Sequence, residues 1–107
     1  MAEIKMPFNP MYREWLLYNR KTATTRFKKY GNPGDTFKAF GAEFELLDVR
    51  HTTWCAVLNN EYQAEGFSTP AAFREVWEDI HPGRKGRDSM ADVWFHVFRR
   101  LPAVSHD

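Results

Sequence analysis

The sequence contains only one cysteine, Cys55, among its 107 residues. A single cysteine cannot form an internal disulfide, and a lone thiol is typical of proteins in a reducing compartment. No apolar run approaches the roughly 20 residues that a membrane-spanning helix requires. The first residues include Glu3 and Lys5 and lack the apolar segment of a secretory signal. We therefore expect a soluble, cytoplasmic protein without a membrane partner.

Several catalytic signatures are also absent. The four histidines are scattered without the spacing of metal ligands, and one cysteine cannot build a zinc site. The stretch Gly31-Asn32-Pro33-Gly34 has the composition of a turn and is no nucleotide-binding fingerprint. No serine lies in a nucleophile elbow. The sequence therefore predicts neither a bound metal nor an organic cofactor.

Bulky side chains are plentiful: the chain has nine Phe, four Trp and four Tyr. Together with the length, they predict one domain over residues 1–107, with a core at about 4–101 and a frayed C-terminal tail. We expect this domain to be a monomer.

The formal charge of +1 conceals an uneven distribution. Residues 1–38 hold eight Lys/Arg against three Asp/Glu, 39–80 hold two against eight, and 81–107 hold five against three. The two basic segments could meet as a surface for a polyanion, or the charges could intermix in the folded protein.

Capping residues and apolar periodicity predict three helices, and runs of β-branched and apolar residues predict strands. With their caps, the helices cover residues 9–19, 53–65 and 69–81. Asn19 can close the first helix in a left-handed conformation, and the apolar stripe of that helix consists of Met11, Tyr12, Trp15, Leu16 and Tyr18. The strands cover residues 4–6, 20–26, 36–40, 43–50 and 93–101. Apolar residues of both parities in the strand at 43–50 indicate that both its faces are partly covered. The pattern as a whole predicts an α+β protein.

The segment from Arg20 to Arg26 combines three hydroxyls with three cations. On a strand, Thr22, Thr24 and Arg26 share one face, while Lys21 lies at the start of the strand. A cation beside hydroxyls can bind an anion or activate a nucleophile. The alternative is a solvated edge strand on which lysine prevents pairing with another chain.

Glu65 lies only about 20° around the helix from Trp54, on the apolar stripe, if the second helix extends that far. It would then be partly buried at the negative end of the helix dipole, and both conditions disfavour a carboxylate. Such a carboxylate usually has a cationic partner, a hydrogen-bonding task or a catalytic role. The alternative is that Asn59-Asn60 ends the helix early and leaves Glu65 in a solvated loop.

Five short motifs occur in an order that resembles the ASCH domain, a family of the PUA-like group. They are Lys21-Thr22-x-Thr24-x-Arg26, Gly34-Asp35, Glu65-Gly66, Trp77…Ile80-His81-Pro82-Gly83 and Trp94-Phe95-His96-Val97-Phe98. The resemblance covers about residues 8–101 and implies a small β-barrel flanked by two to three helices. Within the family, the chain is most similar to small bacterial amidohydrolases that remove the acetyl group from acetylcytidine.

This resemblance implies a catalytic set of Lys21, Thr24 and Glu65. Thr24 would attack the amide carbonyl, Lys21 would take its proton or stabilise the anion, and Glu65 would hold Lys21. The sequence departs from the family at Thr25, where an apolar residue is usual, and in a longer, more charged loop from Arg84 to Asp92.

The partner implied is a modified nucleoside or single-stranded RNA. The alternative to hydrolysis is an RNA-binding module without chemistry, and RNA cleavage is a third option. The aromatic side chains near the site could stack a base or simply pack in the core. The basic loop after residue 83 suits phosphate contact and equally suits a plain surface turn. The residues expected to bind substrate or RNA are Arg20, Thr22, Arg26, Phe67, Arg84 and Lys85.

Overall fold

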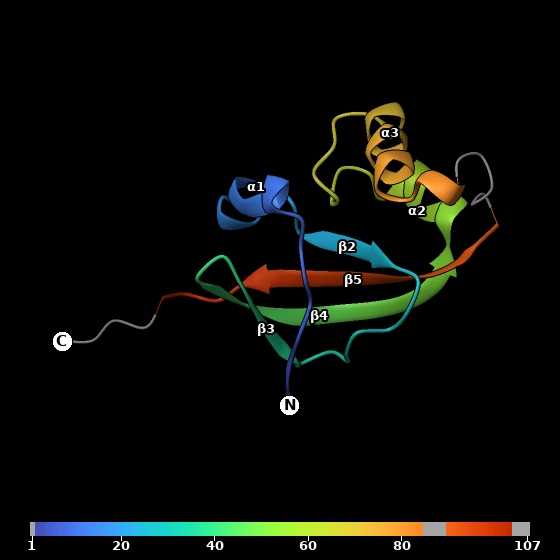
Figure 1. Cartoon of the computed structure of the whole chain (residues 1–107). Coiled ribbons are helices and arrows are strands. Elements are labelled where there is room, and N and C mark those ends of the chain that lie inside the picture. Colours follow the sequence, from blue (N-terminus) through green and yellow to red (C-terminus); the bar gives the residue numbers. More distant parts are fainter. Residues whose placement is uncertain (1, 85–89, 104–107) are drawn as a thin grey trace.

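The computed structural model describes residues 2–84 and 90–103, so residues 104–107 of the predicted tail lie outside the described part. Figure 1 shows the arrangement of its elements. The strands are β1 (Glu3–Ile4), β2 (Ala23–Arg26), β3 (Thr36–Ala39), β4 (Ala42–Thr53) and β5 (Asp92–Arg100). The helices are α1 (Arg13–Leu17), α2 (Trp54–Asn60) and α3 (Pro70–Ile80), with the short 3-10 segments η1 (Pro10–Tyr12) and η2 (Pro82–Arg84).

The described strands form one sheet in the order β1-β3-β4-β5-β2. β1 pairs parallel to β3, and the other neighbours are antiparallel. The predicted α+β class is confirmed. The two paired residues of β1 both pair with β3, and no pairing within the described residues joins β1 to β2. These pairings therefore give an open strand order and do not close the barrel that the resemblance implies.

A register shift between Leu46 and Asp48 explains the mixed pattern of β4. Before the shift Phe44 and Leu46 are buried, at the shift Leu47 is 49% exposed, and after it Val49 packs against the core. A β-bulge adds one residue to one strand, so the even-numbered residues face the core before the bulge and the odd-numbered Val49 faces it afterwards. The prediction that both faces of this strand are covered was therefore wrong at Leu47, because one buried face accounts for the pattern.

The predicted helix 9–19 is divided into η1 and α1. Asn9 caps it by accepting a hydrogen bond from the backbone N–H of Met11 at 3.0 Å. Asn19 has the predicted left-handed conformation, with φ of 60°. Because α1 already ends at Leu17, Tyr18 lies outside the helix and is exposed, contrary to its predicted place on the apolar stripe.

The second helix is shorter than its apolar stripe predicted. Thr53 caps α2 by accepting from the N–H of Ala56 at 3.3 Å, but the helix ends at Asn60. Asparagine side chains compete for backbone hydrogen bonds and disfavour a helix interior. Hydrogen-bonded turns continue from there to Gly66, so Glu65 lies in a turn and the extended helix was wrong.

The third helix forms at the predicted place. Thr69 accepts a hydrogen bond from the N–H of Ala72 at 3.2 Å, and Phe73 and Trp77 are buried. In Figure 1, α1 and the α2–α3 pair lie on the same side of the sheet, with β2 between them. None of the helices in residues 2–84 and 90–103 is long and apolar enough to cross a membrane.

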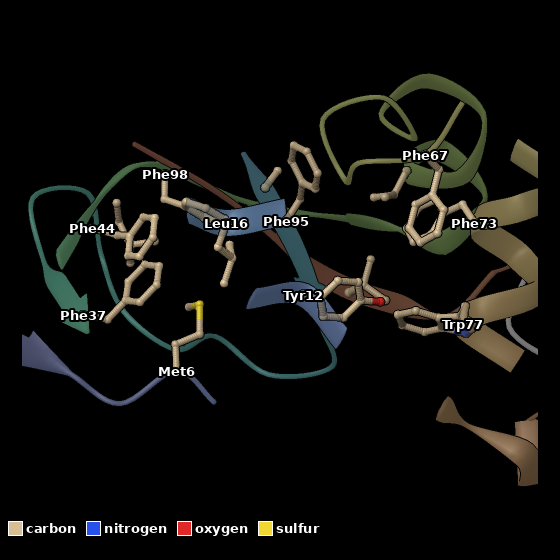
Figure 2. Packing of buried hydrophobic residues seen from close by; sticks show 14 of the residues in the cluster. Met6, Tyr12, Leu16, Phe37, Phe44, Phe67, Phe73, Trp77, Phe95 and Phe98 are labelled. Atoms are coloured by element: carbon tan, nitrogen blue, oxygen red, sulfur yellow. The ribbon is translucent and has the colours of Figure 1, made fainter. Parts of the chain in front are cut away.

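The buried aromatic side chains form two groups. The ring centroids of Phe37 and Phe98 lie 5.4 Å apart between the strands. Trp54 stacks on Trp77 between α2 and α3, with 4.1 Å between the ring centroids. Tyr12 lies between the strand group and the helix group (Figure 2). This position places its phenol beside the cavity described next.

Candidate functional site

A buried ion pair links the start of β2 to the turn after α2. Lys21 Nζ donates to Glu65 Oε1 at 2.7 Å and to the Glu65 backbone oxygen at 3.3 Å. Each side chain is only 3% exposed. The expected cationic partner of Glu65 is therefore Lys21, and the solvated-loop alternative is excluded.

Backbone hydrogen bonds on two sides position this pair. The N–H of Lys21 donates to the carbonyl of Trp15 at 2.9 Å, and the N–H of Thr22 donates to the carbonyl of Ala64 at 2.8 Å. The segment before β2 is thus attached to α1 on one side and to the residue preceding Glu65 on the other.

Gly66 is required by the turn that presents Glu65. Its φ is +101°, a conformation that residues with a Cβ rarely adopt. A Cβ at this position would lie 2.8 Å from Cε3 of Trp15. The pairing of a carboxylate with a following glycine, visible in the sequence, therefore has a steric reason.

The two neighbouring threonines have different partners. Thr25 Oγ1 donates to Glu65 Oε2 at 2.5 Å. Thr24 Oγ1 instead accepts a longer hydrogen bond from Arg26 Nε, at 3.4 Å, which places these two side chains on one face as predicted. Glu65 thus holds Lys21 with one oxygen and Thr25 with the other, and Lys21, Thr24 and Glu65 all border the same pocket.

Arg26 is enclosed by backbone and aromatic groups. Its Nη2 donates to the carbonyl of Pro7 at 2.5 Å, and its guanidinium lies 4.9 Å and 5.1 Å from the ring centroids of Phe8 and Tyr30. Burial lowers the pKa of Arg26, but a guanidinium still stays charged at neutral pH. Arg26 therefore supplies a fixed positive charge beside Thr24.

Burial also changes the titration of the groups around the ion pair. Burial lowers the pKa of Lys21, and the Glu65 carboxylate offsets part of this effect. Burial, together with the nearby Glu65 carboxylate, raises the pKa of Tyr12 to about 12. Its phenol is thus a neutral hydrogen-bond donor at neutral pH, and the Lys21 ammonium lies 4.7 Å from the centroid of its ring.

A cavity of about 460 Å³ lies over this cluster. Its walls come from the segment before α1, from β2 and the residues after it, and from α3. Such a volume falls within the range of small-molecule sites. The lining includes Phe8, Tyr12, Lys21, Thr24, Thr25, Arg26, Phe27, Tyr30, Glu65, Phe73, Trp77 and His81.

His96 supports the strand that carries the threonines. It is fully buried, and its Nε2 accepts from the backbone N–H of Tyr30 at 3.1 Å. We therefore assign the proton to Nδ1, which lies 3.4 Å from the carbonyl of Thr24. Burial lowers the pKa of His96, consistent with the neutral tautomer. In the sequence the histidines are scattered, and nothing in their spacing indicates this role.

Three of the predicted binding residues lie outside the lining of this pocket. Arg20 Nε donates to the carbonyl of Gly66 at 2.9 Å, and Thr22 Oγ1 approaches the carbonyl of Ala64 at 3.5 Å. Phe67 is buried and stacks on Phe73, with 5.1 Å between the ring centroids. These three side chains hold the backbone around the site or fill the core and form no part of the pocket wall, so their contact with substrate or RNA stays a prediction.

The predicted basic loop is mostly outside the described residues. Arg84 forms the end of η2, and Lys85 lies outside the described part of the chain.

In the described regions, some basic and acidic segments intermix. Arg99 pairs with Glu45 at 2.8 Å, and Arg50 pairs with Asp48 and Glu61. Within residues 2–84 and 90–103, no group of three His, Cys, Asp or Glu side chains could hold a metal ion.

Tyr12 was missed as a site residue because its spacing identified it only as part of a helix stripe. Thr25 was recognised as a departure from the family pattern, but the sequence contains no signal for its contact with a residue 40 positions away.

Comparisons with known proteins identify the fold alone. No family model matches the chain, and no curated protein matches it. Among solved structures, the ASCH domain from Lactobacillus crispatus has a TM-score of 0.69 and 12% identity, over 92% of this chain and 78% of that one. The hypothetical protein PH0355 has a TM-score of 0.69 and 13% identity, over 94% of this chain and 100% of that one. The protein PF0455 from Pyrococcus furiosus has a TM-score of 0.58 and 13% identity, over 95% of this chain and 96% of that one. The chain therefore has the fold of an ASCH domain, as the order of its motifs predicted.

Proposed function

We propose that this protein hydrolyses the amide bond of an acylated cytidine or a related modified nucleoside. The observation that carries the proposal is the buried Lys21–Glu65 pair, which lies with two threonine hydroxyls at a pocket of about 460 Å³. A buried cation, a carboxylate and a hydroxyl are the groups that acyl transfer requires.

The walls of the pocket support a flat, aromatic substrate. Phe27, Tyr30 and Trp77 line the pocket, and every nucleobase has a π face that can stack on aromatic rings. The neutral phenol of Tyr12 offers a hydrogen bond to a carbonyl oxygen. An acylated base has both a flat ring, which the aromatic side chains could stack on, and an amide carbonyl, which could accept the hydrogen bond from Tyr12.

In the proposed reaction, a threonine oxygen attacks the acyl carbon, and the C–N bond then breaks. The nitrogen leaves with a proton as the free amine of cytidine, and water hydrolyses the acyl-threonine ester to the carboxylate. The family resemblance assigns the attack to Thr24 and the proton to Lys21. The Lys21 ammonium borders the pocket and would also stabilise the oxyanion in this reaction.

The direct test is to incubate the pure protein with acetylcytidine and to follow formation of cytidine by chromatography. We expect turnover in the parent and a loss of about a hundredfold or more in kcat/KM for Lys21→Met, because the buried positive charge is removed. Lys38→Met is the matched control, since Lys38 is exposed, pairs with exposed Glu3 at 3.4 Å and lies outside the pocket lining. A parent protein that forms no cytidine contradicts the proposal.

A second candidate, a binder of single-stranded RNA, is favoured by two exposed lysines beside aromatic rings. Lys28 Nζ lies 5.0 Å from the ring centroid of Tyr30, and Lys29 Nζ lies 5.6 Å from that of Trp94. Cations next to stacking platforms suit single strands. RNA binding by a protein that does not turn over acetylcytidine would favour this candidate.

A further inference from the structure

We propose that Thr25 supplies the attacking hydroxyl and that Glu65 is its general base. This inference rests on the proposed function and departs from the roles that the family resemblance implies for Thr24 and Lys21. It is carried by the way in which Glu65 divides its two oxygens between Lys21 and Thr25.

The hydrogen-bond directions distinguish the two threonines. An ionised carboxylate has no hydrogen to donate, so the 2.5 Å contact between Thr25 and Glu65 is an O–H donated by the threonine. Bonds of this length are typical of charge-assisted O–H···O⁻ contacts. Thr24 Oγ1 instead accepts from Arg26 Nε at 3.4 Å, and no carboxylate contact to Thr24 is formed in the described residues.

Lys21 orients the base and is poorly placed to act as one. Its Nζ donates to Glu65 Oε1 at 2.7 Å and to the Glu65 carbonyl at 3.3 Å, so its hydrogens are directed at the same residue from two sides. The arrangement is then a nucleophile, a base and an orienting group in a hydrogen-bonded series, as in activated hydroxyl nucleophiles generally.

The Thr25 hydroxyl can meet a substrate. β2 lies at one edge of the sheet among the described strands, and both Thr25 and Glu65 line the pocket. The backbone of Thr25 pairs with that of Phe95 in β5. The strand that carries the hydroxyl is therefore anchored to β5, and the hydroxyl is bonded to Glu65 at the wall of the cavity.

The chemical steps balance. Thr25 Oγ forms a bond to the acyl carbon while its proton passes to Glu65 Oε2, and the carbonyl electrons move to the oxygen, beside the Lys21 ammonium. When the C–N bond breaks, Glu65 returns the proton to the leaving nitrogen. Water then attacks the Thr25 ester and gives its proton to Glu65, which returns it to Thr25 Oγ as the carboxylic acid leaves.

The test is to locate the acyl group on the protein. The parent protein is incubated with acetylcytidine, and separately with p-nitrophenyl acetate, a general acyl donor, and is quenched and mapped by tandem mass spectrometry. We expect an acetyl group on Thr25 with both reagents. The amount of acetylated Thr25 should fall by about a hundredfold or more in Glu65→Gln, because the glutamine side chain cannot accept the hydroxyl proton. Thr25→Ser should retain the adduct, since it keeps the hydroxyl, and Thr36→Val in β3 is the control for a threonine outside the pocket lining.

The outcomes separate this inference from the proposed function. Turnover of acetylcytidine with the adduct on Thr24, or with no threonine adduct, overturns the role of Thr25 and leaves the function in place. An adduct on Thr25 from p-nitrophenyl acetate, without turnover of acetylcytidine, supports the nucleophile and overturns the substrate. Mapping uses the parent protein, so it remains decisive if a variant fails to fold.

Discussion

At the scale of single residues, the most demanding environment belongs to Glu65 and Lys21. Both side chains are only 3% exposed, and each is the other's charge partner. A buried pair of this kind contributes little beyond what well-packed apolar side chains would, but removing one partner leaves an uncompensated charge. The pair is therefore better explained by chemistry than by stability.

Glu65→Gln should consequently destabilise the protein, by about 3–5 kcal/mol near neutral pH, because the Lys21 ammonium stays buried without its carboxylate. Burial already holds the pKa of Lys21 below its ordinary value of 10.5. Without the Glu65 carboxylate this pKa falls further, so the loss is greatest at pH values where Lys21 stays protonated in the folded variant and declines once the folded variant releases that proton. Denaturant unfolding at several pH values measures this, with Glu3→Gln in the exposed pair with Lys38 as the control. A small loss that does not vary with pH would contradict the buried pair.

At the scale of elements, the site depends on short connections more than on the helices and strands themselves. Glu65 is presented by a turn that ends at Gly66, and Lys21 lies in the two-residue link between Arg20 and the residues paired with β5. Both connections are held by backbone hydrogen bonds to α1 and to the turn. Substitutions in these connections should therefore displace the side chains of the site more readily than they disrupt the strand pairing of the sheet.

Gly66→Ala tests that dependence. We expect a loss of more than about 1 kcal/mol in unfolding free energy, because φ is +101° and the added Cβ would lie 2.8 Å from Trp15. Turnover should fall as well, since the turn positions Glu65. Gly83→Ala in η2 is the matched control, with no atom within 4 Å of the added Cβ. Equal urea midpoints for the two variants would show that the turn tolerates a side chain.

At the scale of the whole molecule, the charges are less segregated than their order in the sequence suggests. Arg99 of β5 pairs with Glu45 of β4, and Lys38 pairs with Glu3. The exposed cations that remain beside the pocket include Lys28 and Lys29, which follow β2 directly. If a polyanion binds, this corner of the described surface is where we expect it.

The double variant Lys28→Gln/Lys29→Gln should therefore weaken binding of single-stranded RNA and reduce the slope of log Kd against log salt by about 1 to 2. Fluorescence anisotropy with a labelled oligonucleotide, at several salt concentrations, measures both quantities. Lys38→Gln is the control on the opposite part of the sheet, in β3. An unchanged salt slope in the double variant would place the RNA surface elsewhere, and the absence of binding by the parent would remove this candidate.

The sequence by itself determined the features that depend on neighbouring residues. The caps at Asn9, Thr53 and Thr69 are local hydrogen bonds, and the left-handed residue at Asn19 is a local backbone preference. Alternation placed Thr24 and Arg26 on one face for the same reason. The order of the short motifs was enough to predict the ASCH fold.

Only the tertiary structure decided the contacts between distant residues. The bulge at Leu47 depends on pairing with β5, and the early end of α2 leaves Glu65 to be held by tertiary contacts rather than by a helix. Glu65 meets Lys21 and Thr25 across 44 and 40 positions, so no periodicity in the chain could identify which threonine the carboxylate accepts from. That choice arises from packing the turn after α2 against β2, where one carboxylate has room for two donors.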